Sequence, residues 1–127
     1  MKVVVTVARI LLGLEFILFG LNVFLQFLHM PMPTGLAGQF LGVLVASHFM
    51  HFVALLQIVG GVLLISGNFL PLALTILGPI LVSILLYHAL MAPAGLPLAA
   101  ITAILWLLVF IYVRGAFTGI VARQVQV

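Results

Sequence analysis

The chain has 127 residues, of which 67% are hydrophobic and 4% charged, with one acidic side chain against four lysines and arginines. Soluble domains carry about 25% charged residues, so this composition is that of an integral membrane protein. The cations behind the formal charge of +3 stand singly near the two ends of the chain, which excludes a basic patch for nucleic acid. The chain has no cysteine, which excludes thiol redox centres, disulfides and metal sites held by thiolates.

Four apolar segments, separated by proline, glycine and polar residues, are each long enough to cross a bilayer. They cover approximately residues 3–28, 40–66, 70–91 and 96–114. The segments are apolar on every side, without the alternating polarity of membrane strands, so they predict helices and exclude a membrane barrel. We therefore expect an all-α membrane protein, a bundle of four transmembrane helices that forms one domain over residues 1–127.

The connections between these segments differ in length. Residues 29–39 contain two prolines and two glycines and predict an irregular loop. Residues 66–69 leave room only for a tight turn, so the second and third spans should be antiparallel neighbours. Residues 92–97 form the third connection, with Pro97 suited to the first turn of the last helix. Pro79 lies inside the third span and predicts a kink there.

The positions of the cations predict the orientation. Lys2 and Arg9 flank the first span, Arg114 and Arg123 flank the last, and neither long connection contains a lysine or arginine. The positive-inside rule therefore places both termini in the cytoplasm, and an even number of spans likewise requires them to lie on one side of the membrane. The alternative is a cleaved signal peptide, whose apolar region of about 7 to 15 residues would be shorter than the first segment.

Small residues spaced four apart allow close contact between membrane helices, and the sequence has two such series. They are Gly38, Gly42 and Ala46, and Gly95, Ala99 and Ala103. We expect the helices that carry them to cross closely, either within one bundle or between subunits. Chance spacing of common small residues is the alternative.

Several longer motifs resemble those of the DoxX family of small membrane proteins. They are "ARILLGLEFILFGLN", "PMP", "LLQIVGGVLLISGNFLPLAL" and "LYHALMAPAGLPLA", which together extend over nearly the whole chain. The resemblance implies four helices in a bacterial cytoplasmic (inner) membrane. It also implies an association with membrane redox chemistry, because the family is named for subunits of a quinol-oxidising, thiosulfate-linked system. The family offers no shared catalytic motif, so no residue role is carried over.

Glu15 is the only acidic side chain, and it stands among leucine, isoleucine and phenylalanine. A charge at mid-membrane costs about 2.5 to 3.5 kcal/mol, so we expect a neutral carboxyl that faces the bundle interior. On a continuous helix Glu15, Asn22 and His29 share nearly one face, with Gln26 one turn beyond Asn22. Such a stripe is suited to a ligand or proton path. The alternative is that these side chains only bond helices together, at about 0.6 to 2 kcal/mol each.

The histidines form the second candidate site. His48 and His51 are three residues apart on one helical face, and His88 and His29 should lie at the same outer end of the bundle. Imidazoles at this position could hold haem iron or another transition metal, relay protons, or hydrogen-bond a quinone. No carboxylate or thiolate completes a ligand set, so no metal is assigned. Gln57 lies almost opposite His48 around the helix and would need a partner on another helix. Histidines bonded only to backbone or amide groups are the alternative.

Three functions are compatible with these observations, and they leave open whether the protein is an enzyme. The first is a redox-associated membrane protein whose polar histidine and glutamate cavity binds a quinone-like ligand. The second is a non-catalytic membrane subunit or chaperone that docks a partner protein, for instance one from a redox system. The third is a small-solute or proton transporter that works as a homo-oligomer. No nucleophile with a base, phosphate loop or carboxylate pair supports hydrolysis or phosphoryl transfer.

Overall fold

The computed structural model describes residues 1–126, and every regular element in this range is helical. Four elements are long and apolar enough to cross a membrane, which makes the chain a multi-pass membrane protein in contact with lipid. The expected all-α membrane bundle is thus confirmed. The spanning helices are α1 (Lys2–Leu25), α3 (Phe49–Ser66), α4 (Leu70–Leu90) and α5 (Leu96–Val113).

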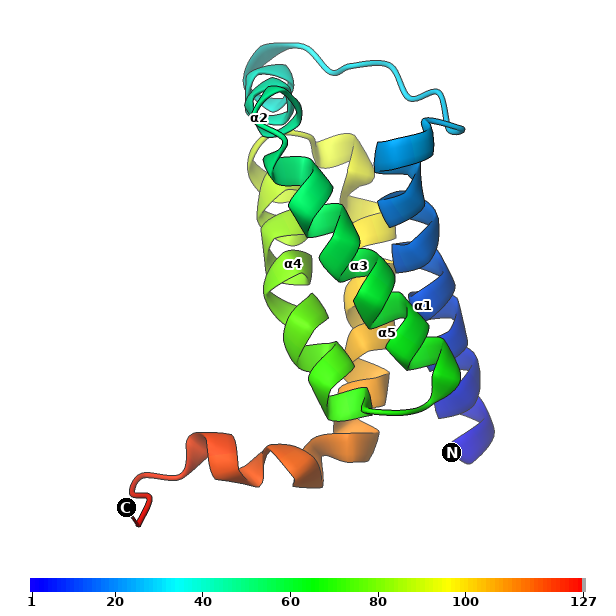
Figure 1. Cartoon of the computed structure of the whole chain (residues 1–127), viewed down its shortest axis with the longest axis vertical. Coiled ribbons are helices and arrows are strands. Elements are labelled where there is room, and N and C mark those ends of the chain that lie inside the picture. The colour runs from blue at the N-terminus through cyan, green and yellow to red at the C-terminus, as the bar shows by residue number, and fades with distance from the viewer. Residues whose placement is uncertain (127) are drawn as a thin grey trace.

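The four long helices pack in a ring, in which α1 contacts α3 and α5, and α4 contacts the same two helices. The chain passes up and down through this ring, so both termini lie at one end (Figure 1). We call this the terminal end, and the opposite end, which carries α2 (Gly35–Ala46), the α2 end. The core between the helices contains the fully buried side chains of Leu12, Leu64, Leu74, Leu77 and Val109.

The second apolar segment does not form one helix over residues 40–66. It is divided between α2 and α3, and α2 is seen nearly along its axis in Figure 1, so it runs across the end of the bundle. The break lies at Ser47 and His48, where His48 has a left-handed backbone with φ of 64°. The 18 residues of α3 rise about 27 Å, close to the hydrocarbon thickness, whereas a helix over the whole segment would rise about 40 Å.

The connections at the terminal end agree with the sequence. Gly67 ends α3 with φ of 76° and begins the short turn to α4, which confirms that α3 and α4 are neighbours joined by a tight turn. Arg9 of α1 donates hydrogen bonds of 2.7 Å from Nη1 to the carbonyl oxygens of Leu64 and Ile65. A cation therefore satisfies the last carbonyls of α3, where the helix dipole is negative.

The remaining two connections lie at the α2 end, where prolines and Asn22 shape the backbone. At the α2 end a short 3₁₀ turn, η1 (Pro93–Gly95), leads into α5, and Pro97 occupies the first turn of α5 as predicted. Pro79 lies inside α4, and Ser83 Oγ bonds to its carbonyl at 3.0 Å. The loop after α1 is held by Asn22, whose Oδ1 accepts a 2.7 Å hydrogen bond from the backbone N–H of Leu28.

The closest helix crossing involves glycines other than those expected. A Cβ atom added at Gly13 of α1 would lie 2.7 Å from the carbonyl oxygen of Gly61 in α3, and one added at Gly61 would lie 2.7 Å from the carbonyl of Gly13. About two turns further along, a Cβ at Gly20 would lie 2.9 Å from the carbonyl of Ala54. The backbones of α1 and α3 therefore touch at two levels.

The two predicted small-residue series do not form a crossing with each other. Gly42 has no atom within 4 Å of an added Cβ, and Gly38 faces Pro33 of the loop that precedes its own helix. Both belong to α2, which lies outside the ring of spanning helices. Gly95 faces His88, and Ala99 is buried in α5. The crossing is therefore not formed within one bundle, because the prediction assigned the residues of α2 to the second span.

Candidate functional site

His48, His51 and Phe24 gather where α1 ends and α3 begins, at the α2 end of the bundle. The rings of His48 and His51 have centroids 5.1 Å apart, and the ring of Phe24 meets His51 edge-on at 5.3 Å. The left-handed backbone of His48 precedes the first turn of α3, and His51 donates its backbone N–H to the His48 carbonyl at 3.2 Å. A sharp local turn thus places two imidazoles beside the aromatic end of α1. We call this the histidine cluster.

The buried nitrogen of His51 distinguishes this cluster from ordinary packing. Its Nδ1 atom is buried and has no hydrogen-bond partner among residues 1–126. Buried polar atoms normally have a partner, because losing water without replacement costs about 1 to 3 kcal/mol. An imidazole nitrogen can donate or accept, depending on the tautomer. The unpaired atom therefore has the chemistry to bond with either a donor or an acceptor.

His88 lies at the same end but has a local partner. Its Nδ1 atom donates to the carbonyl of Ala92 at 3.1 Å, which holds the loop after α4. Tyr87 stacks on Phe40 of α2 at 5.8 Å and meets His88 edge-on at 4.9 Å. This second aromatic group attaches α2 to the bundle. His88 is therefore bonded to the loop that follows α4 and packs against Tyr87, which contacts α2.

The histidines do not assemble into a metal site. Within residues 1–126 no group of three or more histidine, aspartate or glutamate side chains is arranged to hold a metal ion. The candidate ligand set His48, His51 and His88 is thus not brought together, since His88 is bonded to its own loop. His29 stands exposed in the loop after α1. The four histidines lie at the same end of the bundle, as predicted, but they do not form one common site.

The predicted polar stripe along α1 is interrupted. The helix ends at Leu25, and Gln26 turns the chain with a left-handed φ of 52°. Gln26 and His29 therefore leave the face that Glu15 occupies, and Asn22 is used to hold the loop. A continuous path from Glu15 to the surface is not formed, because the stripe assumed a helix longer than α1.

Glu15 has a partner that the sequence did not indicate. The Thr102 hydroxyl in α5 is hydrogen-bonded to Glu15 Oε1, and it also bonds to the carbonyl of Leu98 at 2.9 Å. Thr102 is 4% exposed, so the pair lies within the bundle. Glu15 precedes Phe24 by nine residues, or roughly 13 Å of helix, so it lies outside the histidine cluster.

Gln57 is the second buried polar side chain, with 4% of its surface exposed. It faces α1, since its Cβ would lie 3.3 Å from a Cβ added at Gly20. Its Oε1 atom is buried and has no hydrogen-bond partner in the described chain. The partner on another helix that we expected for Gln57 is therefore not found for this oxygen.

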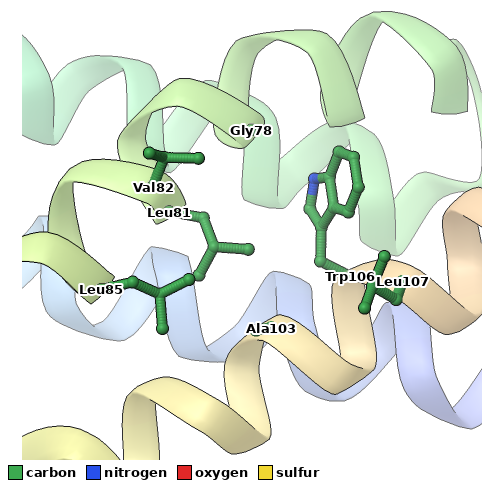
Figure 2. Close-up of a pocket in the computed structure, with 7 residues that line it drawn as sticks. All are labelled: Gly78, Leu81, Val82, Leu85, Ala103, Trp106 and Leu107. Carbon is green, nitrogen blue, oxygen red and sulfur yellow. The ribbon is translucent and has the colours of Figure 1, made fainter.

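A lipid-facing groove lies between α4 and α5, on the side of Trp106. It has a volume of about 320 Å³ and an apolar lining formed by Gly78, Leu81, Val82, Leu85, Ala103, Trp106 and Leu107 (Figure 2). The indole N–H of Trp106 donates to the carbonyl of Leu74 at 3.3 Å, which fixes the ring against α4. The groove provides shape and apolar contact but no polar group for a ligand.

Three residues of structural or candidate functional importance were not singled out from the sequence. Thr102 is easily overlooked because its hydroxyl bonds to its own helix, as threonine does in many membrane spans. Phe24 is one of ten phenylalanines and carries no distinguishing pattern. Arg9 was noted as a flanking cation, but its bonds to α3 depend on the packing of α1 against α3.

The fold and this site define a multi-pass helical membrane protein with a histidine cluster at one end. No protein-family model matches the chain, and comparison with curated proteins and with solved structures likewise gives no match.

Proposed function

We propose that this chain is a DoxX-like protein of the bacterial cytoplasmic membrane that binds a quinone-like ligand for a membrane redox system. The unpartnered Nδ1 atom of His51 is the observation that carries the proposal. The motifs that resemble the DoxX family support the redox association, and the cations at the terminal end support a cytoplasmic location for both termini.

The chemistry of a quinone matches that of the histidine cluster. A quinone ring is flat and largely apolar, with carbonyl oxygens that accept hydrogen bonds and a tail that remains in lipid. His51 would donate to one carbonyl, with the His48 ring 5.1 Å away and Phe24 providing an aromatic edge. In its other tautomer the same nitrogen would accept from the hydroxyl of a quinol, so His51 would pair with the ligand in either oxidation state. The redox chemistry would be that of the ligand.

The proposal is tested by calorimetric titration of the purified full chain with a short-tailed quinone. We expect stoichiometric binding that His51→Ala weakens by about 3- to 10-fold, the value of one hydrogen bond. His29→Ala is the matched control, because that histidine is exposed in a loop, and it should bind like the parent protein. A parent protein that binds no quinone, or equal affinities for the two variants, would refute the proposal.

The groove in Figure 2 favours a second candidate function, a membrane subunit that docks the helix of a partner protein. Gly78 and Ala103 keep the groove open for close backbone contact. Gly78→Leu and Ala103→Leu would fill it, and on this account they would abolish co-purification of the partner while leaving quinone binding intact. Quinone binding that is lost in these variants would contradict the assignment of the groove to a protein.

A further inference from the structure

The helix η2 (Arg114–Val121) begins directly after α5 and turns away from the bundle at the terminal end. In Figure 1 it runs sideways, across the direction of the long helices. Because α5 crosses the membrane, a helix in this direction lies parallel to the membrane surface. Its length, eight residues, is unusual for a 3₁₀ helix.

The side chains of η2 repeat every three residues, so Arg114, Phe117 and Ile120 share one face. Phe117 packs against the core of the bundle, with its ring 5.1 Å from that of Phe110. Ile120 lies one turn further from the bundle on the same face and is 70% exposed. Since Phe117 points toward the membrane-spanning part, Ile120, on the same face, points in the same direction but beyond the core of the bundle.

Exposed arginines lie near the two ends of this segment. Arg114 begins η2 and Arg123 follows it by two residues, and both are exposed. The chain's only acidic side chain, Glu15, is bonded to Thr102 inside the bundle. The exposed side chains near η2 are therefore positively charged and are complementary to an anionic membrane surface.

We propose that η2 is an interfacial helix that lies on an anionic lipid surface, with Ile120 in the acyl boundary. The long side chain of Arg114, which reaches back to the headgroup level, and Arg123 just beyond η2 would bind lipid phosphates. Buried apolar area and attraction to anionic headgroups together stabilise such helices. This inference does not depend on a quinone site, because it concerns the opposite end of the molecule.

The absence of cysteine allows a direct test with single labels. Full-length Ile120→Cys and Thr118→Cys proteins carry a bimane fluorophore in vesicles of phosphatidylcholine with added phosphatidylglycerol. Thr118 is the matched control, since it is exposed on a different face and its hydroxyl bonds only within η2, to the Gly115 carbonyl at 3.2 Å. We expect acyl-chain nitroxides to quench position 120 strongly and water-soluble acrylamide to quench position 118 strongly.

The arginines are tested with nitroxide-labelled lipids of the two headgroup types. Labelled phosphatidylglycerol should quench position 120 more than labelled phosphatidylcholine does, and Arg114→Gln with Arg123→Gln should reduce this preference by about fivefold per residue. Equal quenching by the two lipids in the parent protein would overturn the proposal. Strong acrylamide quenching at position 120, or protection of that position from both quenchers by another protein copy, would also overturn it.

Discussion

Glu15 and Thr102 are hydrogen-bonded to each other across the contact between α1 and α5. The Thr102 hydroxyl has a second contact, at 2.9 Å, with the carbonyl of Leu98. Thr102 therefore shares its hydroxyl between Glu15 and the backbone of its own helix, and the pair joins α1 to α5 within the bundle.

The first prediction concerns the energy of this pair. A double-mutant cycle with Glu15→Leu and Thr102→Val should give a coupling free energy of about 0.6 to 1.7 kcal/mol, the range for side-chain bonds between membrane helices. Glu15→Gln should retain most of the stability, because an amide can donate to the hydroxyl as a neutral carboxyl does. Unfolding in mixed micelles measures each free energy. Strictly additive effects of the two substitutions would show that the bond contributes nothing.

The second prediction concerns the contact between α1 and α3. Gly61→Ala should destabilise the bundle by about 1 to 3 kcal/mol, because the new Cβ would meet the backbone carbonyl of Gly13. Gly42→Ala is the matched control in α2, where an added Cβ meets no atom. It should be neutral, or stabilise by up to about 1 kcal/mol through helix propensity. Equal unfolding free energies for the two variants would contradict the close crossing.

The third prediction concerns Arg9. Its guanidinium bonds to two carbonyls at the end of α3, so Arg9→Met should cost about 1.5 to 3 kcal/mol of unfolding free energy. Lys2→Met removes a cation from the same end of the chain without such bonds in the described structure and should cost much less. Unfolding of both variants in mixed micelles tests this difference. Equal losses of unfolding free energy would attribute the effect to the removal of a positive charge at the terminal end, and not to the two hydrogen bonds of Arg9.

Much of the fold follows from the sequence, because hydrocarbon requires backbone hydrogen bonds to be made within each span. Apolar segments separated by proline and glycine therefore predict the four spanning helices and the turn that begins at Gly67. The break at His48 could not be predicted in this way, since the residues on both sides are equally apolar. The structure explains the break, because α3 alone already matches the thickness of the membrane.

The candidate site was predictable only in part. Counting the spans predicts that the four histidines lie at one end of the bundle. The three-residue spacing of His48 and His51 separately predicts that these two lie together. Phe24 joins them because α1 ends one residue later, and neither that boundary nor the ring packing has a sequence signal. Conversely, Glu15, Asn22, Gln26 and His29 form one stripe only on a helix that continues past Leu25, where α1 ends.

The most direct test of the central claim is photolabelling of the full chain with an azidoquinone, followed by mass spectrometry of the labelled peptides. The account predicts labelling around Phe24 and over residues 48–52, which falls in His51→Ala and is unchanged in His29→Ala. Labelling confined to the groove beside Trp106, or labelling that unmodified quinone does not displace, would contradict a quinone site at the histidine cluster.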